Sequence, residues 1–334
     1  MGGPFVMKLS ILIKTLNEEK NIERCLASIE HACSGLGQDV EIIVADSLSS
    51  DRTAQIAASR GAKVVQLACA GDRGCGAGVQ LGYQHSRGEY VMLLDGDMEL
   101  DAEFLPAAIA KLDGDPSLAG VAGQLEDTAV RNWFDRRRLH VRARETGRQL
   151  KWLSGGGMFR RRAIEEAGGY AGNRNLMAFE EAELGMRLNS HGWRQERLPC
   201  VGVRHTGHIE SSVGLIHRYW RSGRMEAAGV LLRQAFWRPW FSSTVRLFVH
   251  PIGVIAFWLM VVTGLVTFPT QAIVAATCVL AAAFVALAIK KRSVIDACLS
   301  LALWHLGAVG LVRGLLRRPT SPTQRIESRV LGSG

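Results

Sequence analysis

The first half of the chain alternates short, mainly apolar runs with segments in which apolar residues recur at helical spacing. These runs are interpreted as strands of a parallel sheet, and Val91–Leu94, which contains no polar residue, is typical of a strand buried on both faces. They are Leu9–Ile13, Val40–Ala45, Val64–Leu67, Val91–Leu94 and Leu118–Gly123. Between the first two runs, Ile22, Leu26 and Ile29 fit one face of a helix. This order of elements predicts an α/β fold with a doubly wound, mostly parallel sheet.

The second half contains two longer apolar segments, Leu247–Phe268 and Gln271–Ile289, each long enough to span a bilayer as a helix. The turn between them, Pro269-Thr270, carries no charge. Basic residues flank the outer ends of the pair: Arg238, Arg246, Lys290, Lys291 and Arg292. Because positively charged flanks stay on the cytoplasmic side, the pair is predicted to form a hairpin over residues 247–289 with both ends in the cytoplasm.

Two further segments flank this hairpin. His217–Phe241 interleaves arginines with aromatic residues, which is typical of a helix lying in the membrane interface, although an ordinary surface helix has the same pattern. Ala297–Val312 is a short apolar segment, predicted as an interfacial or re-entrant helix within 294–316, with a third span as the alternative. The chain from Pro319 onward is polar and is expected to be loose.

Composition narrows the classes of partner. Hydrophobic residues make up 48% of the 334 residues, and the formal net charge is +9. A basic chain can bind nucleic acid, an anionic membrane surface or phosphorylated ligands. No zinc-finger spacing and no RNA-binding aromatic signature is present, so no nucleic-acid partner is expected. The basic run Asn132–Leu150 is interpreted as a solvated helix face or a surface for acidic lipid or phosphate. The seven dispersed cysteines favour free thiols in a reducing compartment.

The stretch Asp95-Gly96-Asp97 directly follows the buried run Val91–Leu94. Ligand sites in open α/β sheets lie at the carboxyl ends of strands, where these two carboxylates fall. Carboxylate oxygens are suited to Mg²⁺ or Mn²⁺, and either ion can in turn hold a diphosphate. The alternative is that Asp-Gly simply marks a turn after the strand.

Other stretches carry candidate chemistry with equally plain structural alternatives. Gly74–Gly78 meets neither the P-loop nor the dinucleotide signature, so a flexible connector is favoured over a phosphate cradle. The small residues of Ser154–Phe159 allow close backbone approach to a ligand or a tight turn. Glu180 and Glu181 open a predicted helix, where acids are common but can also supply a general base. His205-Thr206-Gly207-His208 is favoured as structural or acceptor-contacting rather than as a zinc site.

Several of these stretches occur in an order that matches a known family. They are Ser10–Glu19, Glu41–Thr53, Arg73–Asp97, Ser154–Arg162, Phe179–Leu188 and Arg221–Arg224. In this order and spacing the chain resembles the inverting, nucleotide-sugar-dependent glycosyltransferases of family 2. The resemblance implies a Rossmann-like, metal-dependent catalytic domain and favours the site interpretation of Asp95-Gly96-Asp97 over the simple turn.

The resemblance also implies a role for each matching position. The residues implied to bind the nucleotide sugar are Thr15, Leu16, Glu18, Asp46, Arg73, Asp95 and Gly96. The implied ligands of Mg²⁺ or Mn²⁺ are Asp97 and Asp95. Glu181 falls where the general base of the family stands, with Glu180 before it as the second catalytic candidate. Candidates for acceptor contact are Gly156, Gly157, His205 and Arg221.

The chain departs from the family pattern at several of these positions. Lys14-Thr15-Leu16 stands where the family usually has Pro-Thr-Tyr, so an aromatic contact to the base is missing. The acid pair that follows the second strand is reduced to Asp46-Ser47. The implied catalytic general base is Glu181, where the family usually has Asp. These departures leave open which nucleotide is bound.

The sequence therefore predicts a membrane-attached inverting glycosyltransferase, acting in polysaccharide or glycolipid biosynthesis. It is expected to move a sugar from a nucleotide-sugar donor to a lipid-linked or saccharide acceptor at the cytoplasmic face of the inner membrane, with membrane lipid as a further partner. The predicted regions are a catalytic domain at 1–216, an amphipathic interfacial region at 217–244, a membrane region at 245–318 and a loose tail at 319–334. The alternatives are a processive polysaccharide synthase and a non-catalytic membrane adaptor that retains the fold.

Overall fold

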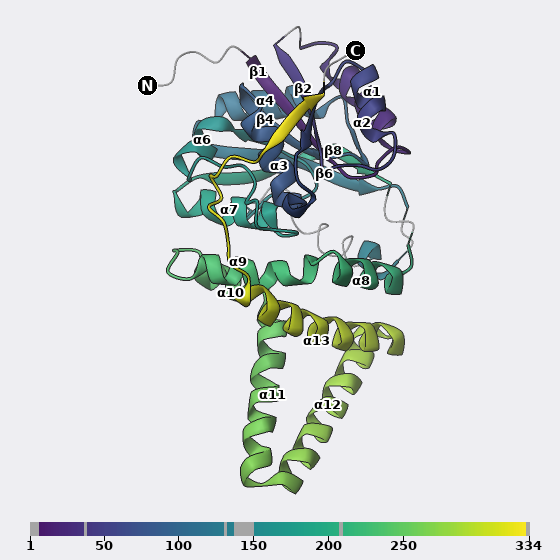
Figure 1. Cartoon of the computed structure of the whole chain (residues 1–334), viewed down its shortest axis with the longest axis vertical. Coiled ribbons are helices and arrows are strands. Elements are labelled where there is room, and N and C mark those ends of the chain that lie inside the picture. Colours follow the sequence, from purple (N-terminus) through teal and green to yellow (C-terminus); the bar gives the residue numbers. More distant parts are fainter. Residues whose placement is uncertain (1–6, 37–38, 130–131, 137–149, 207–209, 332–334) are drawn as a thin grey trace. The chain divides into compact units, whose positions relative to one another are not determined.

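The computed structural model of the chain describes residues 7–36, 39–129, 132–136, 150–206 and 210–331 (Figure 1). It divides into two compact units. The first comprises residues 1–212 together with 319–334, and the second comprises Val213–Arg318. The second unit is thus an insertion in the first, and it contains both the predicted interfacial region and the predicted membrane region. Most of the basic run, residues 137–149, and His208 lie outside the described residues.

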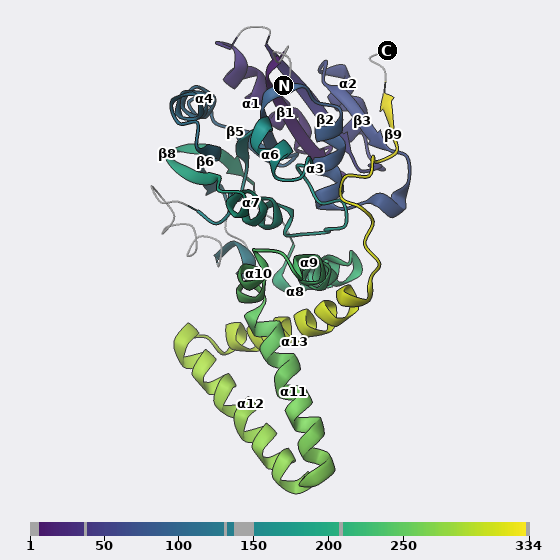
Figure 2. The ribbon, with the colours of Figure 1, turned by 90° about the vertical axis from the view of Figure 1, so that its left-hand side faces the viewer.

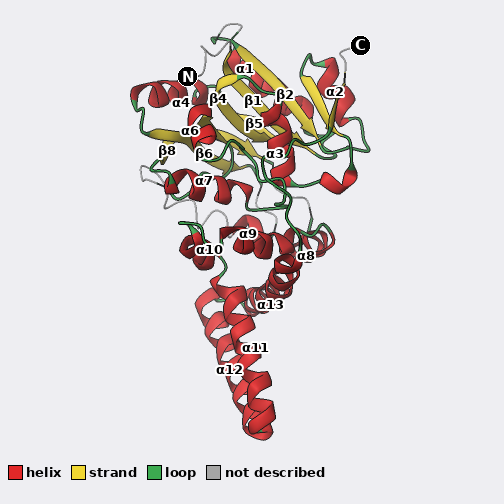
Figure 3. Cartoon of the chain, turned by 60° about the vertical axis from the view of Figure 1, so that its left-hand side comes forward, coloured by secondary structure: helices red, strands yellow, loops and turns green. Residues whose placement is uncertain are grey.

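One sheet with helices on both sides makes up the first unit (Figure 3). Its strands are β1 (Met7–Thr15), β2 (Val40–Asp46), β3 (Lys63–Leu67), β4 (Gly88–Asp95), β5 (Met98–Leu100), β6 (Leu118–Asp127), β7 (Gly157–Arg160), β8 (Arg194–His205) and β9 (Ser328–Leu331). Its helices are α1 (Ile22–Cys33), α2 (Thr53–Ser59), α3 (Cys75–Gln84), α4 (Phe104–Gly114), α6 (Arg161–Glu166) and α7 (Glu180–Ser190), with a short 3₁₀ turn, η1 (Ala70–Asp72). Among the described residues, the strand order is β5-β8-β6-β7-β4-β1-β2-β3-β9.

The centre of this sheet is parallel. Strand β1 pairs in parallel with both β2 and β4, and β2 pairs in parallel with β3. Strand β7 runs antiparallel between β4 and β6, while β6 and β8 are parallel to each other. The predicted α/β fold is confirmed, and its sheet is mixed: the centre is parallel, whereas β5, β7 and β9 run antiparallel to their neighbours.

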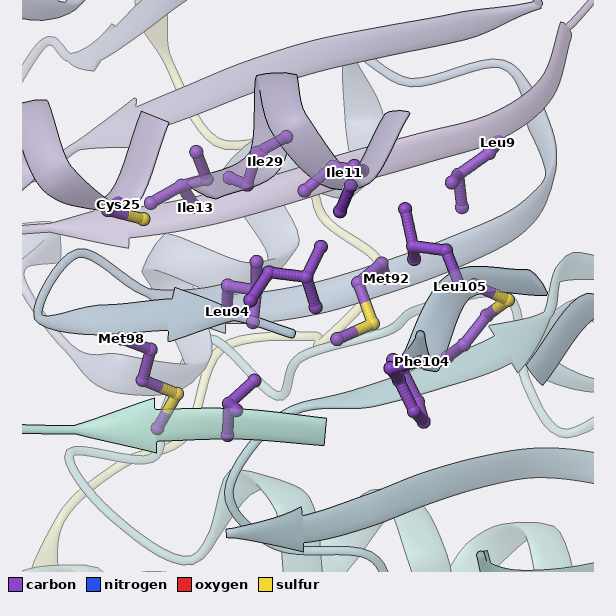
Figure 4. Packing of buried hydrophobic residues seen from close by; sticks show 14 of the residues in the cluster. Leu9, Ile11, Ile13, Cys25, Ile29, Met92, Leu94, Met98, Phe104 and Leu105 are labelled. Atoms are coloured by element: carbon purple, nitrogen blue, oxygen red, sulfur yellow. The ribbon is translucent and has the colours of Figure 1, made fainter. Parts of the chain in front are cut away.

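Two hydrophobic cores lie on opposite faces of the sheet. Leu9, Ile11 and Ile13 of β1 belong to the core that α1, α2 and α4 cover, whereas Leu12 belongs to the core that α3, α6 and α7 cover. Figure 4 shows part of the first core, with β1 and β4 side chains packed among those of α1 and α4. Complete burial of such a side chain contributes about 1.5–3 kcal/mol, so consecutive apolar residues in β1 stabilise both layers.

The tail contradicts the expectation of a loose segment over its described part. Strand β9 pairs antiparallel with β3 at the edge of the sheet (Figure 2). Ile326, just before it, is 0% exposed and belongs to the core on the α3 side. The prediction rested on the polar composition of this segment. It failed because, without β9, strand β3 would be an exposed edge of the sheet, and the unpaired backbone groups of such an edge favour the addition of a strand.

Helices alone form the second unit. They are α8 (Ser212–Arg221), which begins at the boundary, a 3₁₀ turn η2 (Arg224–Glu226), α9 (Ala227–Ala235), α10 (Phe241–Leu247), α11 (Val249–Thr267), α12 (Pro269–Lys291) and α13 (Val294–Leu316). The region predicted as one interfacial helix is therefore several short helices. The chain turns at Gly223, which has φ +73°, and at Trp237, which has φ +66°. Left-handed positions of this kind cannot continue a right-handed helix.

Within the described residues, α11, α12 and α13 have the length and apolar composition to cross a membrane. Helices α11 and α12 form the predicted hairpin (Figure 1). Helix α13 differs, because 28% of its apolar window is buried in the unit and none of theirs is. An added Cβ on Gly314 would lie 2.0 Å from the Glu226 backbone oxygen, and the Glu226 carboxylate pairs with Arg313 and Arg317 at 3.1 and 2.5 Å. The placement of α13 in the membrane interface stays a prediction.

Candidate active site

The carboxyl ends of β1, β2 and β4 bring the predicted donor-site residues together. The register of β1 sets Thr15 opposite Asp46 and Lys14 opposite Asp95. Gly96 follows at once, and its N–H donates to the Lys14 backbone oxygen at 3.1 Å. An added Cβ on Gly96 would lie 2.8 Å from the Thr15 Cγ2 atom, so only glycine fits this approach without a shift.

Asp46 is 0% exposed, and the protein itself supplies its hydrogen bonds. It accepts from the Ser49 N–H at 3.0 Å, the Ser49 hydroxyl at 2.5 Å and the Gln66 Nε2 at 2.8 Å. The Thr15 hydroxyl donates to it at 3.3 Å. A carboxylate with this many donors is fixed in place. In this conformation it holds the loop after β2, and contact with a nucleoside base stays a prediction.

Arg73 and the residues after β1 form the rest of the predicted nucleoside side. Arg73 donates from Nε to the Ser47 backbone oxygen at 2.9 Å and from Nη2 to the Leu48 backbone oxygen at 2.7 Å. Leu16 stands where the family usually has tyrosine, and its side chain is 43% exposed. The Glu18 N–H donates to the Thr53 hydroxyl at 2.8 Å, which ties the loop after β1 to the start of α2.

The glycine-rich stretch is not the flexible connector that the sequence favours. Gly76 and Gly78 lie in the first turns of α3. An added Cβ on Gly76 would lie 2.0 Å from the Asn173 backbone oxygen, and one on Gly78 would lie 3.1 Å from the Lys14 Cβ. These glycines therefore allow α3 to pack closely against β1 and against the loop that precedes α7.

Lys14 links the donor side to the predicted base helix, and sequence reasoning missed its role. Its Nζ lies 3.1 Å from Asp95 Oδ1 and 2.5 Å from Glu180 Oε1. Burial by itself lowers the pKa of Lys14, but the two carboxylates outweigh it and hold the pKa well above its usual value. Burial raises the pKa of Asp95, Lys14 lowers it in part, and Asp97 raises it again. The sequence feature that could have indicated this role is the position of Lys14 near the end of the mainly apolar strand β1.

A histidine joins two carboxylates at the other side of the Asp95-Gly96-Asp97 stretch. Strand β8 lies between β5 and β6. Its His205 is opposite Met98 of β5 on one side and opposite Asp127 of β6 on the other. His205 Nε2 lies 3.1 Å from Asp97 Oδ2, and Nδ1 lies 2.9 Å from Asp127 Oδ1. His205, a candidate for acceptor contact, is thus placed beside the predicted metal carboxylate. Asp127 was missed, although it is the polar end of a long apolar strand.

The carboxylates of this edge fit a divalent cation. Burial raises the pKa of Glu18 to about 7, and the negative charges of Asp97 and Asp95 add to the rise although Asn21 lowers it in part. Crowded carboxylates repel one another, and a cation relieves that repulsion. No set of three or more His, Cys, Asp or Glu side chains is arranged as a complete metal site in the part of the chain that the structure describes. Mg²⁺ commonly uses only one or two carboxylates, with substrate phosphates and water completing its shell.

The predicted base lies at the start of α7 next to the small-residue turn. The Gly155 N–H donates to Glu181 Oε1 at 3.3 Å. Gly155 and Gly156 have φ values of +74° and +82°, and Gly157 begins β7 opposite Leu93 of β4. The turn therefore lies just beyond the end of β4. Sequence reasoning proposed these elements separately, and the sheet register brings them to one edge.

Phe179, immediately before the acidic pair, is another residue that the sequence did not single out. It has φ +67°, which is rare for a bulky side chain and costs energy that surrounding contacts must offset. This turn directs the chain into α7 at Glu180. Arg221, the remaining acceptor candidate, lies at the end of α8. A separate cavity of about 560 Å³ is lined by residues of α1, β5 and β8, and none of the predicted site residues lines it.

Comparison with known proteins gives two family matches. The description "Glycosyl transferase family 2" matches residues 10–169, and "Glycosyl transferase family group 2" matches residues 90–289. The chain is similar to undecaprenyl-phosphate 4-deoxy-4-formamido-L-arabinose transferases. The one from Klebsiella pneumoniae is 28% identical over 152 residues, 44% of this chain and 46% of that protein. The one from Pseudomonas aeruginosa is 32% identical over 133 residues, 38% of this chain and 39% of that protein. The chain therefore spans less than half of either relative.

Solved structures share the fold at lower identity. Mannosyltransferase PcManGT from Pyrobaculum calidifontis, in complex with GDP-Man and Mn²⁺, has a TM-score of 0.61 at 18% identity, covering 91% of this chain and 87% of that chain. TarS 1–349 from S. aureus, in complex with UDP-GlcNAc, has a TM-score of 0.52 at 20% identity, covering 68% of this chain and 66% of that chain. At these identities the likeness concerns the fold alone.

Proposed function

The chain belongs to glycosyl transferase family 2, and we propose that it is a membrane-attached, inverting enzyme that moves a sugar from a nucleotide-sugar donor to a lipid-linked acceptor. The observation that carries this proposal is one sheet edge that gathers two functions. Asp95 ends β4 there and Asp97 comes just after it, and Glu181 lies beside the Gly155 turn at the end of β4. We assign the aspartates to the leaving-group side and Glu181 to the base side.

On the donor side, the proposal assigns nucleoside binding to the loops after β1 and β2. Asp97 and Asp95 would hold Mg²⁺ or Mn²⁺, which when bound supplies positive charge to the leaving diphosphate. His205 fixes the orientation of Asp97, since its Nε2 lies 3.1 Å from the carboxylate. Lys14 holds Asp95 and Glu180 together, so the two sides of the site share one rigid contact.

On the acceptor side, Glu181 takes the proton of an attacking hydroxyl. The acceptor oxygen forms a bond to the anomeric carbon while the bond from that carbon to the diphosphate breaks, and the nucleoside diphosphate leaves with the electron pair. Attack from the side opposite the leaving group inverts the anomeric centre. A positioned carboxylate base of this kind contributes about 10²–10⁴-fold to the rate.

The acceptor class follows from chemistry and from the relatives. Those relatives are named as transferases to undecaprenyl phosphate, which supports a lipid phosphate as the acceptor. A phosphate monoester is largely ionised at neutral pH, so its oxygen needs less help from a base than a hydroxyl does. The importance of Glu181 therefore separates the two acceptors: transfer to a saccharide hydroxyl depends on it strongly, and transfer to a lipid phosphate depends on it less.

Membrane attachment rests on the second unit. Helices α11 and α12 are apolar, and none of their residues is buried. Lys290 and Lys291 close one end of this hairpin, and Arg246 precedes the other end. Basic flanks at both ends support a cytoplasmic location for the catalytic unit, at the inner membrane.

The test uses the detergent-solubilised full chain. A panel of UDP- and GDP-sugars is assayed with undecaprenyl phosphate and with a saccharide acceptor, with and without Mn²⁺, and the anomeric configuration of the product is read by NMR. We expect transfer with inversion, and Glu181→Gln should lower kcat for a hydroxyl acceptor by about 10²–10⁴-fold while donor KM is unchanged. Glu166→Gln, which alters an exposed carboxylate paired with Arg162, is the matched control.

Three outcomes would contradict the proposal. Undiminished hydroxyl transfer by Glu181→Gln would remove the base assignment. Polymeric products would favour a processive synthase. Absence of both transfer and donor hydrolysis over the whole panel would favour a non-catalytic adaptor.

A further inference from the structure

The chain that follows α13 returns to the catalytic unit as an extended segment, residues 319–331, here named the C-terminal strap. Its far end is the strand β9, which pairs with β3. The Ala68 N–H donates to the Glu327 backbone oxygen at 3.0 Å, and His85 Nε2 lies 2.9 Å from the Ser328 hydroxyl oxygen. With Ile326 buried in the core, the strap is an integral part of the unit.

Two side-chain amides grip the strap backbone with the same chemistry at different places. Asn175 Oδ1 accepts from the Thr320 N–H at 2.8 Å, and Asn175 Nδ2 donates to the Thr320 backbone oxygen at 2.9 Å. Gln84 Oε1 accepts from the Ile326 N–H at 3.0 Å, and Gln84 Nε2 donates to the Ile326 backbone oxygen at 2.7 Å. Gln84 belongs to α3, whereas Asn175 belongs to the loop that leads into α7.

That loop, residues 171–179 and here named the α7 approach loop, is fixed from both sides. On its inner side the Gly76 N–H donates to the Leu176 backbone oxygen at 2.9 Å. On the strap side, Arg174 Nη1 donates to the Gln324 backbone oxygen at 3.0 Å. The approach loop ends at Phe179, whose left-handed backbone needs support from its surroundings to persist.

We propose that Asn175, through its paired hydrogen bonds with Thr320 of the C-terminal strap, is a positioning residue for the acidic pair at the start of α7. This inference rests on the proposed function, because it assigns the general base to that pair. Asn175 touches neither donor nor acceptor in this scheme. It fixes the approach loop, the loop fixes the turn at Phe179, and the turn aims Glu181 at the end of β4. The segment that follows the membrane helices in the chain thereby takes part in setting the base.

The test compares Asn175→Ala with Gln84→Ala, since each removes one amide that both donates to and accepts from the strap backbone. We expect Asn175→Ala to lower kcat for transfer to a saccharide hydroxyl at least about tenfold, because small displacements of a catalytic group are costly. Donor KM should stay within about twofold, since the nucleoside loops are not touched. Gln84→Ala should lower the thermal midpoint and leave kcat near the wild-type value. Asn175→Asp, which keeps the acceptor for the Thr320 N–H, should recover part of the kcat.

Hydrogen–deuterium exchange supplies a readout that needs no turnover. Asn175→Ala should speed exchange at the first turn of α7, where the Glu183 N–H bonds the Phe179 backbone oxygen, whereas Gln84→Ala should speed it at β9. Equal kcat values and equal exchange at α7 in both variants would overturn the inference and leave the strap as a purely stabilising element. If the wild-type chain transfers no sugar, the proposed function fails, and the exchange comparison still decides whether Asn175 positions α7.

Discussion

Removal of the Lys14 ammonium tests whether the two halves of the site are held by charge. In Lys14→Met the side chain keeps its length and apolar stem, but Asp95 and Glu180 lose their shared cation. At an effective dielectric constant of about 20, the 2.5 and 3.1 Å contacts each correspond to a gross attraction of about 5–7 kcal/mol. Desolvation of the charges cancels most of that attraction.

The net effect is set by the better buried partner. The Glu180 side chain is 8% exposed, whereas that of Asp95 is 40% exposed and screened by water. Removing one member of a buried pair typically costs about 3–5 kcal/mol, and we take about 3 kcal/mol at pH 8. For a domain of this size that loss lowers the thermal midpoint by roughly 6–12 °C.

The pH dependence distinguishes a charge effect from a packing effect. The raised pKa of Lys14 keeps it charged in the wild type through this range, so its stabilising contribution is present below its usual pKa and is lost only at strongly alkaline pH. In the variant, the orphaned carboxylates can take up protons as the pH falls, and loss of the ammonium raises the pKa of Asp95 further. The difference from wild type should therefore shrink by about half between pH 8 and pH 5.

The assay is thermal unfolding of the detergent-solubilised chain followed by far-ultraviolet circular dichroism at both pH values. Lys20→Met, which replaces an exposed lysine, is the matched control and should leave the midpoint unchanged. The double variant Lys14→Met with Glu180→Gln should lose less stability than the two single variants lose together. Glu180→Gln removes the carboxylate charge that Lys14→Met leaves without its cation. A midpoint change under about 2 °C at pH 8, or one of equal size at pH 5, would refute the electrostatic reasoning.

Three further predictions concern charge and packing. The pKa of Glu18 in the folded chain is about 7, so the folded chain binds an extra proton below that pH and loses stability as the pH rises from about 5 to 7. Glu18→Gln should remove this decline. At pH 8 it should raise the free energy of unfolding, measured by urea titration, by about 2 kcal/mol. Asp97→Asn should raise the Mn²⁺ concentration for half-maximal transfer by about 10–100-fold and more than Asp95→Asn does, and equal shifts would contradict the metal assignment. Gly314→Ala should cost about 1–3 kcal/mol by overpacking, seen as a lower midpoint in detergent, whereas Gly253→Ala, with open space around it, should not.

Local patterns determined a large part of this protein. A run such as Val91–Leu94 needs no partner to be recognised as a strand covered on both faces, because its apolar residues are consecutive. Asp95 and Asp97 follow such a run, and parallel strands end at one edge, so their place at the site edge follows from the chain itself. The long apolar segments of α11 and α12 were likewise visible, since bilayer thickness sets their length.

Contacts between distant segments were decided only by the tertiary structure. Lys14 and Glu180 are 166 positions apart, and they meet because α7 begins beside the end of β1. His205 reaches Asp97 and Asp127 because β8 inserts between β5 and β6, an order that no local pattern encodes. The strap binds as β9 because the edge of β3 offers unpaired backbone groups. Hydrophobic periodicity specifies which face of an element is buried, but the neighbour that buries it depends on the strand order and register of the whole sheet.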